Sequence, residues 1–336
     1  MEPKGPQLRL LEVARQAGVS RTTVSRALGS GPVSPEVRQR VLQAAEALGY
    51  RKNLLAQKLR SNRSHFVGLL IPDVSNPFFA TLAQAVERVF RQHGYGVFLC
   101  NSEEDPATED FYIHTLLDNQ VDALVLTPVT GQLNPRLLAA GIPVVLADRV
   151  IEAPPGLRLA SVTCDNHRGG QLAARALLDR GARRIVVLSP RHPGFSSSLA
   201  ARLAGFVEEL ALAGVTSRQQ ALEPEVAAVR AYLDSLPRGS FDALFCTSDL
   251  VAFPTIKALQ DLGLAVPNDV QVVGFDGLAL GEVLELSTIR QDLDRVGQAV
   301  GEAALALIAG KAYPRDSVVP VELVARRSLR QLPSEF

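Results

Sequence analysis

The spacing of hydrophobic positions changes once along the chain, after about 60 residues. Before that point, apolar residues recur at helical spacing and predict helices over residues 11–17, 21–28 and 35–48. Gly18 and Ser20 favour a turn and an N-cap before the second helix, and Pro35 suits the first position of the third. The first part of the chain is therefore predicted to be a small all-α unit.

From Phe66 onward, short β-branched runs alternate with longer amphipathic segments. Strands are predicted over residues 66–71, 97–99, 123–126, 144–146, 162–164, 185–188, 243–246, 270–274 and 318–321. The helices predicted between them include residues 78–92, 169–180, 200–213, 250–262 and 296–309. Such alternation is typical of parallel sheets. The series divides into two similar halves near Asp165, so we expect an α/β core with two lobes.

Charge is unevenly distributed along a chain whose net charge is zero. Residues 1–64 carry twelve Lys and Arg but four Asp and Glu, a net of +8, and residues 65–336 carry a net of −8. A basic arm on an acidic body is typical of a polyanion-binding module joined to a second unit, although a solvated basic surface would have the same composition.

Two further features of the sequence bear on where the protein works. No apolar run approaches the ~18–20 residues that span a bilayer, and the start MEPKGPQLRL lacks the apolar core of a signal peptide. Cys100, Cys164 and Cys246 are widely spaced and odd in number, which is typical of reduced thiols. We therefore expect a cytoplasmic protein with no membrane partner.

The segment from residue 13 to residue 28 has the spacing of a helix-turn-helix motif. Apolar side chains of both predicted helices face inward, which leaves a polar, basic face at the start of the second helix. Arg can read guanine bidentately, and Thr can contact a thymine methyl group or a phosphate. The predicted DNA-binding residues in this segment are Ser20, Arg21, Thr22, Thr23, Ser25 and Arg26.

Three consecutive stretches resemble the lactose-repressor (LacI) family of bacterial transcription regulators. These stretches are EVARQAGVSRTTVSRAL, VSPEVRQRVLQAAEALGY and RKNLLAQKLRSNRSHFVGLLIP, and the resemblance continues through SNPFF, DALVL, ADR, RLAGF, DALFCTSDLVA, VVGFDG and STIRQ. It implies a homodimeric repressor that binds pseudo-palindromic double-stranded operator DNA under the control of a small molecule, with a sugar expected. It also implies a Rossmann-like core similar to periplasmic ribose- and glucose-type binding proteins.

The resemblance also sets the expected domain boundaries. The helix-turn-helix head is expected over residues 1–52, a hinge helix and linker over 53–64, and the two-lobed core over 65–336. Lobe 1 is expected to combine residues 65–164 with 292–322, and lobe 2 to combine 165–291 with 323–336.

The polar segment from residue 53 to residue 60 is predicted to be the hinge. Leu55 and Leu59 are spaced i, i+4, but so short a helix is marginal alone and should form only against a twin and DNA. The resemblance implies that Leu59 wedges into the minor groove, a device that kinks DNA, and that Asn53 contacts DNA. Gly29 stands where relatives often carry a DNA-contacting Asn, so that contact is expected to be absent.

Polar residues just past the ends of predicted strands mark a second candidate site. Ligands of open α/β sheets bind beyond the carboxyl ends of strands, where carboxylates, amides and Arg can bridge hydroxyls and aromatic rings can cover a sugar's C–H face. From strand position and resemblance together, the predicted effector-binding residues are Asp73, Asn76, Phe78, Phe79, Asp148, Arg149, Arg202, Ser248, Asp276 and Gln291. Ser248 replaces an Asn frequent in relatives, and without Trp any aromatic lid must be Phe or Tyr.

Other classes of function receive less support from the sequence. No GxxxxGK[ST], GxGxxG, HExxH or CxxC motif occurs and the five His are dispersed, so we expect no enzyme, cofactor or metal site. A basic head and the missing signal peptide disfavour a transport binding protein. Control by a protein corepressor or by a nucleoside- or purine-like ligand stays open, although Asn76, Asp148, Arg149, Arg202 and Asp276 together favour a sugar.

Overall fold

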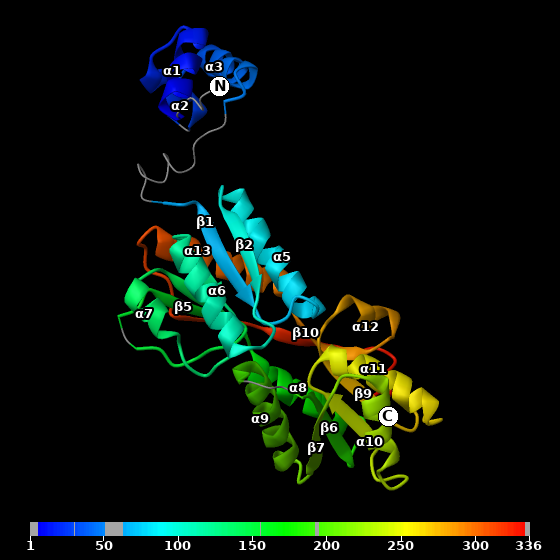
Figure 1. Cartoon of the computed structure of the whole chain (residues 1–336). Coiled ribbons are helices and arrows are strands. Elements are labelled where there is room, and N and C mark those ends of the chain that lie inside the picture. Colours follow the sequence, from blue (N-terminus) through cyan, green and yellow to red (C-terminus); the bar gives the residue numbers. More distant parts are fainter. Residues whose placement is uncertain (1–5, 30, 51–62, 155, 192–194, 333–336) are drawn as a thin grey trace. The chain divides into compact units, whose positions relative to one another are not determined.

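The computed structural model describes residues 6–29, 31–50, 63–154, 156–191 and 195–332 (Figure 1). The chain forms two compact units, Met1–Ser64 and His65–Phe336, which we call the head and the core. Asn53, Leu59 and the rest of the predicted hinge helix lie outside the described residues.

The head consists of three helices: α1 (Pro6–Ala17), α2 (Arg21–Leu28) and α3 (Pro35–Ala47). Val13, Val24 and Val41, one from each helix, are fully buried and form the centre of its core. Ser20 and Ser34 cap α2 and α3, since each hydroxyl accepts a backbone N–H bond from the residue three positions later. The predicted starts of α2 and α3 are confirmed, whereas α1 begins five residues earlier than predicted.

Arg38 of α3 fixes the end of α2. Its Nη1 donates to the carbonyl oxygens of Ala27 and Gly29 at 2.6 and 2.7 Å, and its Nη2 donates to that of Gly31 at 2.8 Å. The last carbonyl groups of a helix have no partner within the helix, so this guanidinium satisfies acceptors that would otherwise need water. One side chain of α3 thereby ties the end of α2 to α3, in addition to the apolar core that the helices share.

The first lobe contains a six-stranded sheet in which every neighbouring pair is parallel. Its order is β11 (Asp316–Val319), β5 (Leu159–Cys164), β4 (Val144–Ala147), β3 (Ala123–Leu126), β1 (Phe66–Ile71) and β2 (Gly96–Asn101). Alternate residues of β1 point to opposite faces. Val67 and Leu69 pack with α5 (Pro77–Gln92) and α13 (Leu293–Ile308), and Leu70 packs with α6 (Pro106–Asp118) and α7 (Pro135–Ala140).

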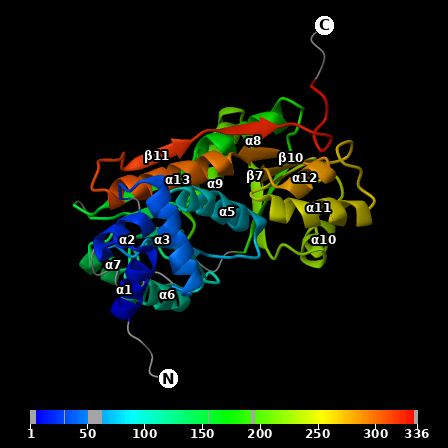
Figure 2. The same cartoon turned by 90° about the horizontal axis from the view of Figure 1, so that it is seen from above.

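The second lobe repeats this arrangement with one antiparallel pair, β10–β12. Its sheet order is β12 (Val321–Val324), β10 (Ser287–Gln291), β9 (Gln271–Asp276), β8 (Ala243–Cys246), β6 (Ile185–Pro190) and β7 (Ser217–Leu222). One face is covered by α8 (Asn166–Leu178) and α9 (Ser197–Leu212), and the other by α10 (Val226–Asp234) and α11 (Asp249–Asp261). The short α12 (Ala279–Val283) follows β9 in the chain and lies beside α11 in both views (Figures 1 and 2).

Two strands of the second lobe were not predicted, and one predicted strand is in fact two. β7 is a polar edge strand, and β10 carries Ser, Thr, Arg and Gln, so neither has the apolar run that marks a strand in the sequence. The predicted strand 318–321 is divided at Pro320 into β11 and β12, which belong to different sheets. The chain therefore passes between the lobes here, as it also does after β5 and after β10.

Glycines bring pairs of helices into backbone contact in each lobe. A Cβ at Gly170 of α8 would lie 2.0 Å from the carbonyl oxygen of Arg202, and one at Gly205 of α9 would lie 2.0 Å from that of His167. In lobe 1, a Cβ at Gly297 of α13 would lie 2.4 Å from the Cβ of Ala85. The absence of side chains at Gly170 and Gly205 therefore allows the close approach of α8 and α9.

Replacing Gly205 with Ala should destabilise the core. The added methyl group would press on backbone atoms of α8, which cannot yield as a flexible side chain can, so we expect a loss of about 1–3 kcal/mol or more. Urea unfolding measures this change. Gly131→Ala is the control, because its nearest atoms lie at an ordinary 3.5 Å, and a similar loss in both variants would contradict the close-packing argument.

Candidate functional site between the two lobes

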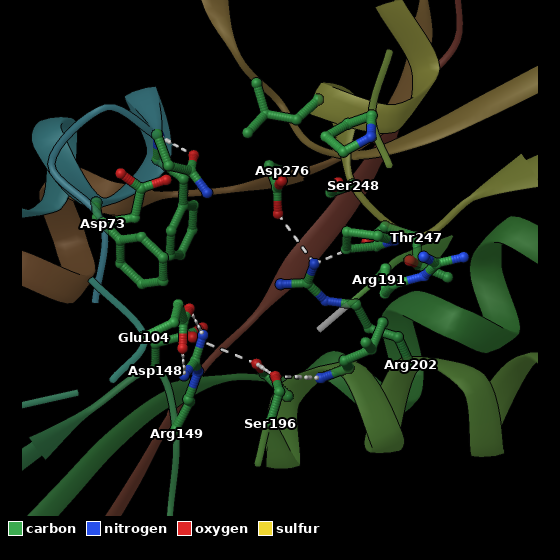
Figure 3. Close-up of a pocket in the computed structure, with 18 residues that line it drawn as sticks. Asp73, Glu104, Asp148, Arg149, Arg191, Ser196, Arg202, Thr247, Ser248 and Asp276 are labelled. Atoms are coloured by element: carbon green, nitrogen blue, oxygen red, sulfur yellow. Dashed lines mark hydrogen bonds and ion pairs between the residues drawn. The ribbon is translucent and has the colours of Figure 1, made fainter. Parts of the chain in front are cut away.

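A cavity of about 220 Å³ lies between the lobes, at the carboxyl ends of the strands. Its lining residues are Asp73, Asn76, Phe78, Phe79, Glu104, Asp148, Arg149, Pro190, Arg191, Ser196, Ser198, Leu199, Arg202, Pro224, Thr247, Ser248, Leu250 and Asp276 (Figure 3). Every predicted effector-binding residue except Gln291 lines it. Gln291 lies behind the cavity wall, where its Nε2 donates to Asp276 Oδ1 at 2.9 Å.

The first turn of α5 forms one wall of the cavity. Asn76 caps this helix by accepting the Phe78 N–H at 3.0 Å, which fixes the two phenylalanines that follow. The rings of Phe78 and Phe79 are nearly perpendicular, with centroids 5.0 Å apart, and both side chains are buried. This wall therefore offers apolar ring surface next to polar groups.

Arg149 belongs to a buried ion pair contributed by lobe 1. Its Nη1 and Nη2 donate to the two carboxylate oxygens of Glu104 at 2.9 and 2.6 Å. The Arg149 side chain is 3% exposed and that of Glu104 is 16% exposed. Bidentate pairs of this kind are strong and geometrically specific. The carboxylate partner of Arg149 in the structure is therefore Glu104, from the loop that follows β2.

Arg202 belongs to a corresponding pair contributed by lobe 2. Its Nη1 donates to Asp276 Oδ1 at 3.1 Å and to the Thr247 carbonyl oxygen at 2.9 Å, and its Nε donates to Asn166 Oδ1 at 2.7 Å. The guanidinium also lies over the ring of Phe275, with its central carbon 3.9 Å from the centroid. The buried charge is thus held on several sides, and Figure 3 shows it directed toward Asp276.

Asp148 joins the lobes. Its Oδ2 accepts a hydrogen bond from Ser198 of α9 at 3.2 Å, and the neighbouring Val150 N–H donates to the Ser197 hydroxyl at 2.8 Å. The Oδ1 atom of Asp148 is buried without a partner among the described residues, as is the hydroxyl of Thr247. Buried polar atoms without partners are costly, so both atoms suit a ligand that supplies hydrogen bonds.

Two cavity-lining residues at strand ends, Asp148 and Asp276, have an unusual backbone conformation and a raised side-chain pKa. Asp148 has φ 65° and Asp276 has φ 120°, a left-handed region that residues other than Gly rarely adopt. Burial raises the pKa of Asp148 against the opposing effects of Arg202 and Arg149. Burial likewise raises the pKa of Asp276 to about 7, opposed mainly by Arg202. Backbone strain and perturbed ionisation in one cleft are typical of functional sites.

Asp249 supports the site without lining it. Its carboxylate is fully buried and accepts bonds from the N–H groups of Gly277 and Leu278 at 3.0 and 2.8 Å and from the Thr288 hydroxyl at 2.7 Å. Burial raises the pKa of Asp249 to about 6. This side chain therefore fixes the turn that follows Asp276, a role that its place after a strand does not reveal.

Sequence reasoning missed six polar residues that the structure brings to the cavity or its wall. Arg191, Ser196, Ser198 and Thr247 line the cavity, and Asn166 holds Arg202 from behind. Glu104 also lines it, and its place three residues after the carboxyl end of β2 was a signal that could have found it.

The predicted DNA-reading side chains lie along α2 and at its N-cap. Arg21, Thr22, Ser25 and Arg26 are exposed, on the face opposite the buried Val24 and Ala27. Thr23 is half-buried, and its hydroxyl lies 2.9 Å from that of Ser20 at the cap.

Membrane-spanning and metal-binding features were also sought in the described residues. Within those ranges, no helix combines the length and the apolar character needed to cross a bilayer. In the same ranges, no group of three or more His, Cys, Asp or Glu could hold a metal ion.

The raised pKa of Asp276 predicts a pH-dependent stability. Because an unfolded Asp ionises near 3.9, the folded chain holds more protons than the unfolded chain between about pH 4 and 7. The free energy of unfolding contributed by Asp276 should therefore fall as pH rises through this window and level off above it. In urea unfolding, the free energy of unfolding of wild type should fall by up to about 1 kcal/mol for each unit of rising pH, relative to that of Asp276→Asn. Asp234→Asn, on the surface of α10, should run parallel to wild type, and parallel curves for all three would contradict the prediction.

Comparisons with known proteins support the predicted family over almost the whole chain. Residues 9–53 match the model of the bacterial regulatory proteins of the lacI family, and residues 64–327 match that of the periplasmic binding proteins and sugar binding domain of the LacI family. The ribose operon repressor of Halalkalibacterium halodurans is 35% identical, with 95% of this chain and 96% of that protein covered.

Two solved structures show the same architecture. A LacI family transcriptional regulator from Enterococcus faecalis V583 with bound ribose is 26% identical, with a TM-score of 0.69, 79% of this chain and 98% of that chain covered. The lac repressor dimer bound to operator and the anti-inducer ONPF is 24% identical and shares the fold, with a TM-score of 0.80, 97% of this chain and 99% of that chain covered. These findings confirm the predicted fold class and a regulator instead of an enzyme. The chain is thus a DNA-binding transcriptional regulator and belongs to the LacI family of bacterial regulatory proteins.

Proposed function

We propose that this chain is a cytoplasmic, homodimeric repressor whose affinity for a pseudo-palindromic operator is set by a sugar bound between the lobes of its core. The observation that carries the proposal is the cavity in which each lobe presents one guanidinium–carboxylate pair, Arg149–Glu104 and Arg202–Asp276. Charged donors and acceptors held in fixed positions are suited to vicinal hydroxyls, because each can bridge two of them.

A sugar fits the lining better than the two alternatives do. The two phenylalanines offer ring surface for C–H groups, and the buried Asp148 Oδ1 accepts from a hydroxyl. A purine would favour a flat slot between rings, whereas these rings are nearly perpendicular. A protein corepressor would give no reason to bury two ion pairs around a cavity. The relatives named for ribose make D-ribose the first sugar to test.

Closure of the lobes is the proposed carrier of the signal. Hydrogen bonds from the Ser198 hydroxyl to Asp148 and from the Val150 N–H to the Ser197 hydroxyl already join the lobes beside the cavity. A sugar held by Arg149 of one lobe and Arg202 of the other would add contacts that exist only in the closed form, and a ligand shifts an equilibrium only through such differences. We propose that closure alters the spacing of the two hinge segments, residues 53–64, of a dimer, where Asn53 and Leu59 would contact DNA.

Operator recognition is assigned to the exposed face of α2, with Ser20 and Thr23 as supporting residues. Arg21 and Arg26 are the side chains there that can read a guanine edge. Arg21→Ala or Arg26→Ala should each weaken operator binding by about 1–3 kcal/mol while changing random-DNA binding far less. Gel shifts on both DNAs measure the difference, with Arg230→Ala on the core surface as control. Equal losses on both DNAs would mean that the arginines contact phosphates only.

Sugar control is assigned to the cleft and should fail when Asp276 is removed. Asp276→Ala leaves the buried guanidinium of Arg202 without its carboxylate, so the variant should bind sugar at least tenfold more weakly and still bind operator. Calorimetry and gel shifts measure the two affinities.

The linkage between the two sites supplies a stricter measurement. The factor by which sugar changes operator affinity must equal the factor by which operator changes sugar affinity. Sugar titrations of wild type with and without operator should therefore differ. If those isotherms superimpose, the sugar is not the effector, and a protein corepressor becomes the better proposal.

A further inference from the structure

We propose that Glu104 is a specificity-determining residue of the cleft, which makes the protein favour an uncharged sugar over an anionic sugar of the same skeleton. It does so by holding the guanidinium of Arg149 in a bidentate ion pair. This inference rests on the proposed function and names the charge class of its effector.

The Glu104 carboxylate occupies the edge of the Arg149 guanidinium that carries its two terminal nitrogens. Both terminal nitrogens donate to Glu104, at 2.6 and 2.9 Å, and Nη1 also lies 3.3 Å from the carbonyl oxygen of Pro128. The ring of Phe79 lies alongside, with its centroid 5.8 Å from the guanidinium carbon. An incoming carboxylate or phosphate would have to compete with Glu104 for this edge, whereas a hydroxyl needs only a single hydrogen bond.

The backbone presents Glu104 in a conformation that needs support. Glu103 and Glu104 both have φ 55°, the left-handed region that disfavours such side chains. The Glu104 N–H donates to the carbonyl oxygen of Pro72 at 3.0 Å, and the Asp105 N–H donates to that of Ser102 at 2.9 Å. Strained residues persist where the surroundings determine them, so the loop after β2 is built to hold this carboxylate in place.

Each guanidinium that lines the cavity is matched to a carboxylate of its own. Arg149 pairs with Glu104, Arg202 pairs with Asp276 at 3.1 Å, and Arg191 lies 3.7 Å from Glu223. Asp73 and Asp148 line the cavity as well and add further negative charge. Among the described residues that line the cavity, an anionic ligand would therefore meet no arginine without a counter-ion, and the remaining carboxylates would repel it.

Removing the charge of Glu104 should change this selectivity more than it changes affinity for neutral sugars. In Glu104→Gln the side chain keeps its length and one hydrogen-bond acceptor, but Arg149 keeps a full positive charge without a carboxylate. Glu103→Gln is the matched control, since the neighbouring side chain has the same charge and backbone conformation but is exposed and does not line the cavity.

Calorimetry on the full chain measures the dissociation constants of an anionic sugar and of its neutral counterpart. The quantity compared is the ratio of the anionic constant to the neutral constant. The probe pairs are D-glucose with D-glucuronate, D-galactose with D-galacturonate, and D-ribose with D-ribose 5-phosphate. For the pair whose neutral member binds wild type, Glu104→Gln should lower the ratio about tenfold or more, the change expected when a nearby charge is lost. Glu103→Gln should keep the ratio within about twofold of wild type, as for an exposed charge.

The outcomes separate the inference from the function on which it rests. A Glu104→Gln variant that loses affinity for both partners at an unchanged ratio would mean that Glu104 is only structural. Wild type that binds the anionic partner more tightly would overturn the inference and leave sugar control standing. Wild type that binds none of the neutral sugars would overturn both.

A second variant guards against misfolding of the first. Glu104→Asp keeps the charge but is too short for the same bidentate geometry, so it should weaken neutral binding and retain the wild-type ratio. Urea unfolding, which should remain a single cooperative transition of the core in each variant, reports correct folding. If the ratio of dissociation constants falls as much in Glu104→Asp as in Glu104→Gln, a role for the charge would be contradicted.

Discussion

The burial of Arg202 is the constraint on which the core depends most. Moving a guanidinium out of water costs several kcal/mol unless its donors find partners of good geometry. The partners here come from three elements: Asn166 opens α8, Thr247 follows β8, and Asp276 ends β9. The second lobe must therefore bring these elements together correctly before the charge can be accommodated, and the same requirement orients the side chain toward the cleft.

The close approach of α8 and α9 makes that arrangement possible. Gly170 and Gly205 allow the two backbones to touch, and this brings Asn166 within 2.7 Å of the Arg202 Nε. The first lobe uses Gly297 in the same way between α13 and α5, the helix that carries the two phenylalanines of the cleft. Close packing of these helices is thus part of how the cavity is shaped.

The cleft is polar, strained and incompletely paired, and these properties belong together. Carboxylates buried at strand ends have raised pKa values because water no longer stabilises their charge, and Asp148 retains an oxygen without a partner among the described residues. Such a site gains from a ligand that supplies hydroxyl donors. Because its residues come from both lobes, that gain would also favour closure, the step that we propose links the chemistry of the cleft to the affinity for DNA.

Much of this protein follows from its sequence, because the relevant signals are local. Helical spacing and capping residues predict the head, strand–helix alternation predicts a parallel core, and residues just past strand ends identify most of the cavity. The exact starts of α2 and α3 follow from Ser20 and Ser34, whose hydroxyls act within one turn. The hinge, with Leu59, remains a prediction from sequence.

What only the tertiary structure decided depends on contacts between distant segments. β7 and β10 lack an apolar run and are strands because neighbouring strands supply their hydrogen bonds. The partner of Arg149 is Glu104, 45 residues away, because the loop after β2 and the turn after β4 converge only once the chain is folded. Side-chain type can be read from a sequence, but the identity of a counter-ion is set by how loops converge in space.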